Sequence, residues 1–486
     1  MLEIIEEVVD LKKEMRLVID KIIKFSIPSI ISFAINILSA IIVTRHFIPS
    51  DYGLINTFNA TSTFIMAIAC LGLDSGFIRY FFDLPSGFDK KTLFLSSLII
   101  PIIALLFFSL IIFIIPNNFS NLLFGVNNKY LLILLCINVF STIVLRFLTI
   151  LYRMDGNTLM YTLLIVSAQV SLKGALIFAA FIKPNLFFSI NSIVISMLLM
   201  VFIFIMYNYK NLKPININFI KKIHNLTDFF KYSFYSWPIP TLLYFNILTT
   251  LLIIRLKLGS EAVGIFSSLS VFVGLIGVLQ TGFTTFWSGF MYENYQKKQA
   301  QIRKINEYVS FLTILLLIGF ILFKDVMYLL IGKNYHDTKP YFAIILINPI
   351  MLILTETTSY GISIAKKSRL LLIITLLTVI INLGLSWILI PKLGILGAAI
   401  ASAMSGVFFF LTQTFYGLKY YSSVENVNKV LFAVFLILFL AFSNLFIHNS
   451  FLFILVICLI VLIVSIFLFK SIFNNILNQI LPKNQY

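Results

Sequence analysis

Charged residues are scarce in this chain. Asp, Glu, Lys and Arg make up 11% of its 486 residues, whereas soluble domains carry about a quarter. Hydrophobic residues make up 60%, and the mean hydropathy is +1.02. Apolar runs of about twenty residues, each able to cross the roughly 30 Å of a bilayer's hydrocarbon core, recur from Phe25 to Phe469. These features exclude a soluble protein and predict an all-α polytopic membrane protein of about fourteen transmembrane helices.

Cysteine and histidine are also few. Cys70, Cys136 and Cys458 all fall within apolar runs and show no disulfide or metal-ligand spacing, and the four histidines lie apart near loops. The chain has no phosphate-binding glycine loop, no zinc-protease motif, no nucleophile elbow and no carboxylate pair in a long loop. We therefore expect no enzyme activity, no metal site and no cofactor, apart from a coupling proton or sodium ion.

The basic residues carry topological information. A net charge of +17 would suggest a nucleic-acid partner in a soluble chain, but here Lys and Arg lie mostly in short loops beside apolar runs. They crowd into alternate loops, as at Lys297, Lys298, Arg303 and Lys304. The positive-inside rule assigns these loops and both termini to the cytoplasmic side of the plasma (inner) membrane. We expect no nucleic-acid partner.

An internal similarity divides the chain into halves. Arg45, Ser50, Asp51 and Gly53 follow the first apolar run as Arg255, Ser260, Glu261 and Gly264 follow the seventh. This repeat predicts two six-helix bundles around a central cavity, plus a terminal helix pair. The predicted segments are a cytoplasmic N-terminal amphipathic segment (1–24), a first six-helix bundle (25–207), a cytoplasmic basic linker (208–231), a second six-helix bundle (232–418), helices 13 and 14 (419–470) and a cytoplasmic tail (471–486).

Basic side chains inside the spans are candidates for ligand binding, since each costs about 2.5–3.5 kcal/mol unless it faces a cavity or a partner. Arg146 and Lys173 lie deepest, in consecutive spans, and Gln169 precedes Lys173 by one helical turn. Arg153 shares a helix face with Arg146, either as a second cavity cation or as an anchor at the membrane interface. Ligand contact and structural anchoring are both open for Arg45 and Arg255. The predicted substrate-binding residues are Arg45, Arg146, Gln169, Lys173 and Arg255.

Two acidic residues inside the spans are candidates for ion coupling. Glu356 begins a polar helix face that continues through Ser359, Tyr360 and Ser363. A buried carboxylate can bind a proton or a sodium ion, although Glu356 could instead pair with a basic residue of a neighbouring span. Asp74 and Arg79 are five residues apart and point in different directions, so each needs another partner. We predict Glu356 and Asp74 as the ion-coupling residues.

Several stretches in combination resemble a known family. They are Arg45 with Pro49 to Gly53, Gly72 to Asp74 with Arg79, Tyr152 to Asn157, and Pro391 to Ala399. Together with the span count, they resemble the polysaccharide transporters, or O-antigen repeat-unit flippases, of the multidrug/oligosaccharidyl-lipid/polysaccharide (MOP) exporter superfamily, over nearly the whole chain.

The resemblance implies a function and partners. The expected fold is two bundles with alternating access, and the expected activity moves an undecaprenyl-diphosphate-linked oligosaccharide from the inner to the outer leaflet. The expected partners are that lipid-linked oligosaccharide, membrane lipids and glycan-assembly enzymes. Arg45 matches a motif of the family, whereas Arg146, Lys173 and Arg255 are assigned to the substrate by their chemistry.

Three alternatives stay open. A drug or organic-cation antiporter of the same superfamily would want acidic rather than basic residues in its cavity. A membrane glycan polymerase or glycosyltransferase would need long outer loops with acid/base residues, which the sequence lacks. A structural or scaffolding membrane protein would have little use for charges inside its spans.

Overall fold

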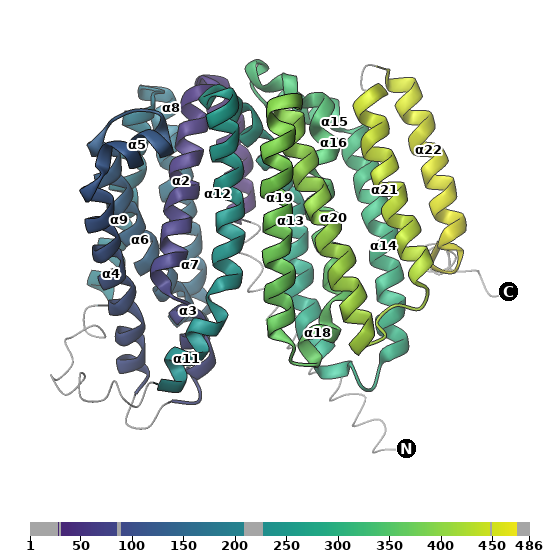
Figure 1. Cartoon of the computed structure of the whole chain (residues 1–486), viewed down its shortest axis with the longest axis horizontal. Helices are drawn as coiled ribbons and strands as arrows, with labels where there is room; N and C mark the ends of the chain where they lie inside the picture. Colours follow the sequence, from purple (N-terminus) through teal and green to yellow (C-terminus); the bar gives the residue numbers. More distant parts are fainter. Residues whose placement is uncertain (1–27, 29–30, 85–88, 209–226, 448–449, 474–486) are drawn as a thin grey trace. The chain divides into compact units, whose positions relative to one another are not determined.

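The chain is helical throughout the part that the structure describes (Figure 1). The computed structural model describes residue 28 and residues 31–84, 89–208, 227–447 and 450–473. Within these ranges, 13 helices are long and apolar enough to cross a membrane, and a shorter apolar helix, Ile31–His46, precedes them. Helices suit an apolar chain in lipid because each backbone N–H and C=O must bond within its own segment. The prediction of an all-α polytopic membrane protein is confirmed.

Contacts divide the chain into two compact units, the first ending at Leu252 and the second beginning at Ile253. The first unit contains the helix Ile31–His46, α2 (Pro49–Cys70), α3 (Leu73–Tyr80), α4 (Lys90–Ile114), α5 (Pro116–Phe124), α6 (Lys129–Met154), α7 (Thr158–Gln169), a π-helical turn (Val170–Gly174), α8 (Ala175–Ile182), α9 (Leu186–Tyr207), α11 (Thr227–Ser236) and most of α12 (Pro238–Leu258).

The second unit continues from the end of α12. Its elements are α13 (Ser260–Asn294), α14 (Gln299–Leu322), α15 (Lys324–Leu330), a 3-10 helix (Lys333–Tyr341), α16 (Phe342–Ile345), α17 (Ile347–Thr358), α18 (Tyr360–Ile364), α19 (Ser368–Leu393), α20 (Ile395–Tyr420), α21 (Val427–Ile447) and α22 (Phe451–Leu468).

The division predicted from the sequence stays a prediction. The segment 1–24 and most of 208–231 and 471–486 lie outside the described residues. The unit boundary falls inside α12, and α11 belongs to the first unit because it packs along α3.

Asparagine and aspartate side chains begin four helices of the first unit. Asp89 accepts a hydrogen bond from the Thr92 amide at 3.0 Å, which caps α4. Asn128, Asn157 and Asn185 cap α6, α7 and α9 in the same way. Such caps satisfy backbone donors that the first helical turn leaves open. The hydrogen bonds with Thr92 lower the pKa of Asp89.

Helix α6 is the centre of the first unit and packs against α2, α4, α7 and α9. Its buried residues include Leu131, Leu135, Val139 and Phe147, all fully covered by neighbouring helices. A polar contact adds specificity to this packing, since Asn138 of α6 donates to the Ser62 hydroxyl of α2 at 2.8 Å. Residues carried by α6 therefore have fixed positions within the unit.

Helices α17 and α20 form the centre of the second unit. Charged side chains connect α21 to other helices of this unit. Lys429 of α21 pairs with the buried carboxylate of Glu307 in α14 at 2.9 Å. Lys324, at the start of α15, donates to Asn444 of α21 at 2.9 Å, and burial lowers the pKa of Lys324. Helix α21 is thus linked to α14 and α15 by polar side chains.

Two of the helix interruptions come without proline. Leu71 and Gly72 both have left-handed backbone angles, with φ of 48° and 73°, and separate α2 from α3. Ser359 separates α17 from α18. Pro101 lies inside α4 without ending it, whereas Pro238 begins α12 directly after the break at Trp237. An interruption of a span therefore does not need a proline, and a proline does not always end a helix.

Candidate functional site

One face of α6 carries a stripe of polar residues. Thr142, Arg146, Thr149 and Arg153 are spaced by four, three and four residues, which places them on one side of the helix. All four line a cavity of about 360 Å³ inside the first unit. The stripe thus combines hydroxyl groups with two guanidinium groups, which donate hydrogen bonds and carry positive charge.

The rest of this cavity is mostly apolar. Helix α7 contributes Tyr161, Ile165 and Ala168, while Met66 and Met197 come from α2 and α9. No aspartate or glutamate lines the cavity within the part of the chain that the structure describes. An amphiphilic ligand with an anionic group suits such a lining better than a cation does.

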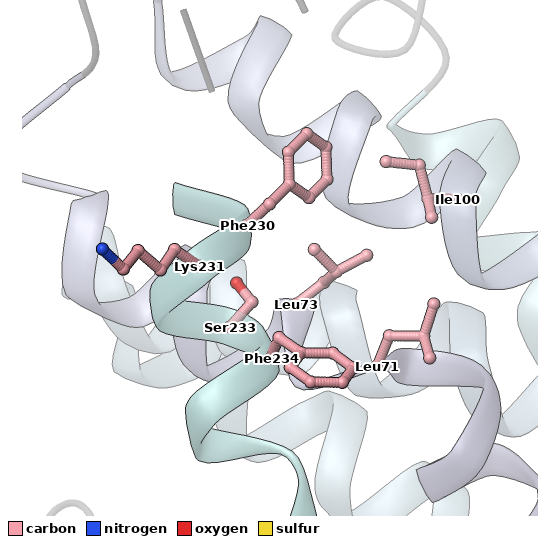
Figure 2. A pocket seen from close by; sticks show the side chains of 7 residues that line it. All are labelled: Leu71, Leu73, Ile100, Phe230, Lys231, Ser233 and Phe234. Carbon is pink, nitrogen blue, oxygen red and sulfur yellow. The ribbon is translucent and has the colours of Figure 1, made fainter. Parts of the chain in front are cut away.

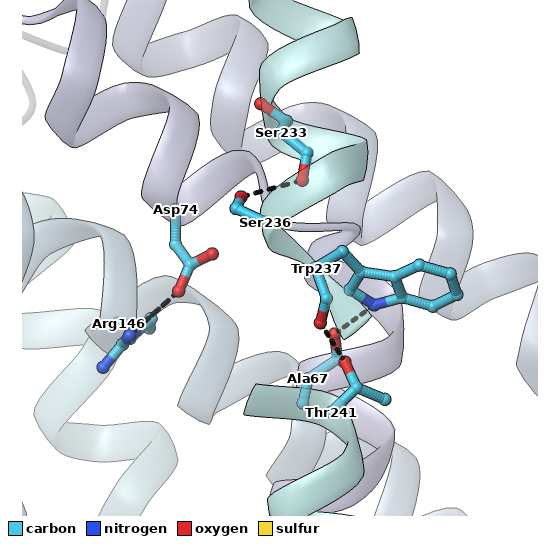
Figure 3. Close-up of polar contacts among 7 residues, drawn as sticks. All are labelled: Ala67, Asp74, Arg146, Ser233, Ser236, Trp237 and Thr241. Atoms are coloured by element: carbon cyan, nitrogen blue, oxygen red, sulfur yellow. Dashed lines mark hydrogen bonds and ion pairs between the residues drawn. The ribbon is translucent and has the colours of Figure 1, made fainter. Parts of the chain in front are cut away.

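Arg146 forms an ion pair with Asp74 of α3. Its Nε and Nη2 atoms both donate to Oδ2 of Asp74, at 3.2 and 2.9 Å (Figure 3). The Arg146 side chain keeps 46% of its surface exposed, against 12% for Asp74. Asp74 also lies in the first turn of α3, where the helix dipole favours a carboxylate. The guanidinium is therefore held on one side and open to the cavity on the other.

This pairing joins two residues that the sequence analysis placed in separate roles. Arg146 was predicted to bind substrate and Asp74 to couple an ion, and the argument that Asp74 needs a partner other than Arg79 is confirmed. Arg153 was left open between cavity and anchor, and its place in the cavity lining favours the first. The seven-residue spacing between Arg146 and Arg153 is the sequence feature that indicated a shared helix face.

Lys173 lies in a π-helical turn, Val170–Gly174, between α7 and α8. The turn interrupts the predicted fifth span near its middle, and such bulges often occur at functional sites. Lys173 is half-buried, and neither Lys173 nor Gln169 has a side-chain hydrogen bond or ion pair with any residue that the structure describes. Neither residue lines the Arg146 cavity.

The other two predicted basic residues are not among those that line this cavity. Arg45 is exposed one residue before the end of the helix Ile31–His46. Arg255 is half-buried in the part of α12 that belongs to the second unit. Their assignment to substrate binding stays a prediction.

Glu356 lies in a polar cluster of the second unit. Its carboxylate shares a hydrogen bond with the Thr284 hydroxyl of α13, and Tyr360 has one with Ser288. The fully buried Trp287 donates its indole N–H to the Glu356 carbonyl at 2.8 Å. No ion pair of Glu356 occurs among the described residues. The described residues thus give no support to the alternative that Glu356 pairs with a basic residue of a neighbouring span.

The break between α2 and α3 is held by Trp237. The Leu71 amide bonds to the Ile68 carbonyl at 3.2 Å, so it leaves the Ala67 carbonyl without its helical donor. The Trp237 indole N–H donates to that carbonyl at 3.0 Å (Figure 3). Trp237 itself lies at the break between α11 and α12. Two interrupted helices therefore meet at their breaks, which the sequence analysis did not foresee.

Glycine allows this close approach. A Cβ atom on Gly72 would lie 2.1 Å from the Ser233 carbonyl oxygen, and one on Gly76 would lie 2.0 Å from the Ser233 hydroxyl oxygen. Helix α11 can therefore pack directly on the backbone of α3. We call this contact, made by Ala67, Gly72, Gly76, Ser233 and Trp237, the helix-break contact.

Metal binding has no support in the described residues, where no three His, Cys, Asp or Glu side chains gather. The first unit offers two guanidinium groups, a lysine and hydroxyl groups, and the second offers a carboxylate beside the Thr284 hydroxyl.

Comparison with solved structures identifies the fold. The chain is similar to the lipid II flippase MurJ in an inward closed conformation, with a TM-score of 0.70 and 16% identity over 94% of this chain and 99% of that one. A multidrug resistance MATE family transporter of the MOP superfamily, in an inward-facing conformation, gives a TM-score of 0.57 and 15% identity over 80% and 94%.

A MOP superfamily transporter from Pyrococcus furiosus gives a TM-score of 0.56 and 16% identity over 82% of this chain and 95% of that one. No protein-family model and no curated protein matches the chain. The chain therefore has the fold of the MOP superfamily transporters, as the sequence resemblance implied, and is a multi-pass membrane protein.

Proposed function

We propose that this chain is a flippase that moves an undecaprenyl-diphosphate-linked oligosaccharide from the inner to the outer leaflet. The observation that carries the proposal is the cavity of the first unit, where Arg146 and Arg153 face a partly apolar lining without an acidic group. A diphosphate and its sugars cannot cross hydrocarbon unaided, because each desolvated polar group costs several kcal/mol. The lipid tail can stay in the bilayer while the headgroup moves through the protein.

Arg146 can bind a phosphate without breaking its ion pair. Both hydrogen bonds to Asp74 come from Nε and Nη2, which leaves the Nη1 group directed elsewhere. A guanidinium suits a phosphate because it offers several N–H donors in one plane and keeps its charge. Arg153 lies seven residues further along α6, about 10 Å along the helix axis. The two arginines can therefore contact one extended anionic headgroup.

We assign the remaining predicted residues to the path of the same headgroup. Lys173 has a positive charge and no partner among the described residues, so an anionic ligand would compensate its burial. Gln169, Arg45 and Arg255 complete the proposed set. We propose that transport proceeds by alternating access to the two sides of the membrane.

We propose that transport is coupled to a proton or a sodium ion through Glu356, with Asp74 as a second candidate. The hydroxyl groups of Thr284 and Ser288 near Glu356 and Tyr360 provide oxygen atoms of the kind that hold such ions. Asp74 is already neutralised by Arg146, which makes Glu356 the stronger candidate.

The proposal includes orientation and partners. Both termini lie on the cytoplasmic side of the plasma membrane, and glycan-assembly enzymes supply the substrate. The fold is shared with multidrug transporters, so a drug antiporter is the rival. Two arginines in the cavity lining would repel an organic cation, which favours the flippase.

Vesicles with the purified protein test this function. The measurement is the movement of a lipid-linked oligosaccharide between leaflets by the wild type, Arg146→Ala, and the Arg146→Ala, Lys173→Ala double variant. We expect a loss of activity at equal protein level, larger in the double variant. Arg369→Ala, at an exposed position in the second unit, is the control. Full activity of the double variant, or transport of organic cations instead, would overturn the proposal.

A further inference from the structure

A second cavity in the first unit is lined by residues of α11, α3 and α4 and by Leu71. It measures about 390 Å³ and is lined by Leu71, Leu73, Ile100, Phe230, Lys231, Ser233 and Phe234 (Figure 2). It shares no lining residue with the Arg146 cavity. We call it the α11 groove.

The inside of the α11 groove is apolar. Five of its lining residues have hydrocarbon or aromatic side chains, and the hydroxyl of Ser233 already donates to the Phe229 carbonyl at 2.8 Å. Phe234 keeps 60% of its surface exposed, so the groove opens at the surface of the unit. In a membrane, a groove of this kind holds hydrocarbon rather than water.

The depth of the groove in the membrane suits the acyl chain of a lipid. Ile100 follows Lys90, the first residue of α4, by ten residues, or about 15 Å along a helix axis. That distance is half of the roughly 30 Å hydrocarbon core. An acyl chain that enters from the end of α4 near Lys90 therefore reaches the groove within one leaflet.

Lys231 is the only charged residue in the described lining of the groove. Its side chain extends from α11 with the amine pointing away from Ile100 (Figure 2). The amine has no ion pair among the described residues, although Asp228 lies one turn earlier on α11. A lysine beside an apolar groove, with its amine directed out of the groove, suits a lipid phosphate.

We propose that the α11 groove binds one anionic phospholipid of the cytoplasmic leaflet, with an acyl chain in the groove and its headgroup on Lys231. The groove is separate from the Arg146 cavity. The bound lipid is therefore a lipid of the bilayer rather than the transported lipid. The bound chain touches Leu71 and Leu73 on either side of the α2 to α3 break, together with α11. It therefore stabilises the helix-break contact.

Fluorescence quenching tests the proposal with the full chain in vesicles. A tryptophan introduced as Ile100→Trp reports on the groove, and the parent protein gives the background from Trp237, Trp287 and Trp387. The probes are phosphatidylglycerol and phosphatidylcholine with brominated acyl chains. We expect phosphatidylglycerol to bind in the groove about fivefold more tightly than phosphatidylcholine, because one lysine near the headgroup favours an anionic lipid by about this factor. Lys231→Gln removes this preference.

Lys419→Gln is the matched control, since Lys419 is an exposed lysine near the end of α20 in the second unit. The Lys419→Gln protein should keep the preference for phosphatidylglycerol over phosphatidylcholine. Native mass spectrometry of the unmodified chain provides a second measurement, in which one phosphatidylglycerol is retained by the wild type and by Lys419→Gln and lost by Lys231→Gln. Equal quenching by the two lipids, or equal retention in all three proteins, overturns the site. Displacement of the brominated lipid by a small amount of polyprenyl phosphate reassigns the groove to the transported lipid.

Discussion

Asp74 and Arg146 form an ion pair of 2.9 Å between α3 and α6, in which the arginine is half exposed to a cavity and the aspartate is nearly covered. The pair has two consequences. It fixes the guanidinium at the cavity wall, and it joins the cavity to the helix that begins directly after the α2 to α3 break.

Substitutions of the pair should have opposite effects on anion binding. The negative charge of Asp74 offsets the positive charge of the Arg146 guanidinium and repels a ligand phosphate, so Asp74→Asn should raise the affinity for farnesyl diphosphate while lowering stability by about 1 kcal/mol, the usual size of an interhelical polar contact in membranes. Arg146→Ala should lower that affinity. Binding to purified protein and thermal unfolding are the measurements.

Asp83→Asn is the control for this comparison, since Asp83 is an exposed aspartate shortly after α3. This substitution should change neither the affinity for farnesyl diphosphate nor the stability. If Asp74→Asn and Arg146→Ala weaken binding equally, the pair has only a structural role.

The helix-break contact should be intolerant of a methyl group at Gly72. In Gly72→Ala the new Cβ would meet the Ser233 carbonyl oxygen, which belongs to the backbone and cannot rotate away. We expect a loss of about 1–3 kcal/mol in stability beyond the backbone strain. Gly156→Ala isolates the strain, because Gly156 has the same φ of 73° and a Cβ added there would meet nothing within 4 Å. Equal melting temperatures of the two variants would show that the close approach does not matter.

Glu356→Gln should uncouple transport from the ion gradient. The indole of Trp287 bonds to the main-chain carbonyl of Glu356, so this contact survives the substitution and the fold should be kept. Transport in vesicles with and without a proton or sodium gradient is the measurement. Glu293→Gln, at an exposed position on α13, should behave as the wild type. A Glu356→Gln protein with normal gradient dependence would assign this carboxylate to structure.

Labelling of single cysteines tests the orientation. With the three native cysteines replaced, a cysteine at Lys297 should resist a membrane-impermeant maleimide added outside intact cells, because the basic loops face the cytoplasm. A cysteine at the exposed Lys183, in a loop that the same rule assigns to the outside, should react. Reaction at Lys297 with protection at Lys183 would reverse the predicted topology.

The sequence predicted which helix face a site residue occupies, but not which residues meet. Arg146 and Arg153 could be placed on one helix face because a spacing of seven residues gives nearly two full turns. That Asp74, 72 residues before Arg146 in the chain, meets its guanidinium could not be predicted, because helical periodicity gives the face of a residue but not the helix that covers it. The π-helical turn at Lys173 likewise has no signal in the apolar pattern.

The sequence alone determined that the chain crosses the membrane many times as helices. Apolar runs leave the backbone in lipid with no other way to satisfy its hydrogen bonds, so span length and charge placement are enough for this conclusion. Tertiary structure alone decided where those helices break and what holds the breaks. Trp237 reaches the Ala67 carbonyl across 170 residues of chain, and Leu71 adopts a left-handed angle beside Gly72 although it is not a glycine itself. Such a break is stable only because a neighbouring helix supplies the missing donor, and that neighbour is fixed by packing rather than by local sequence.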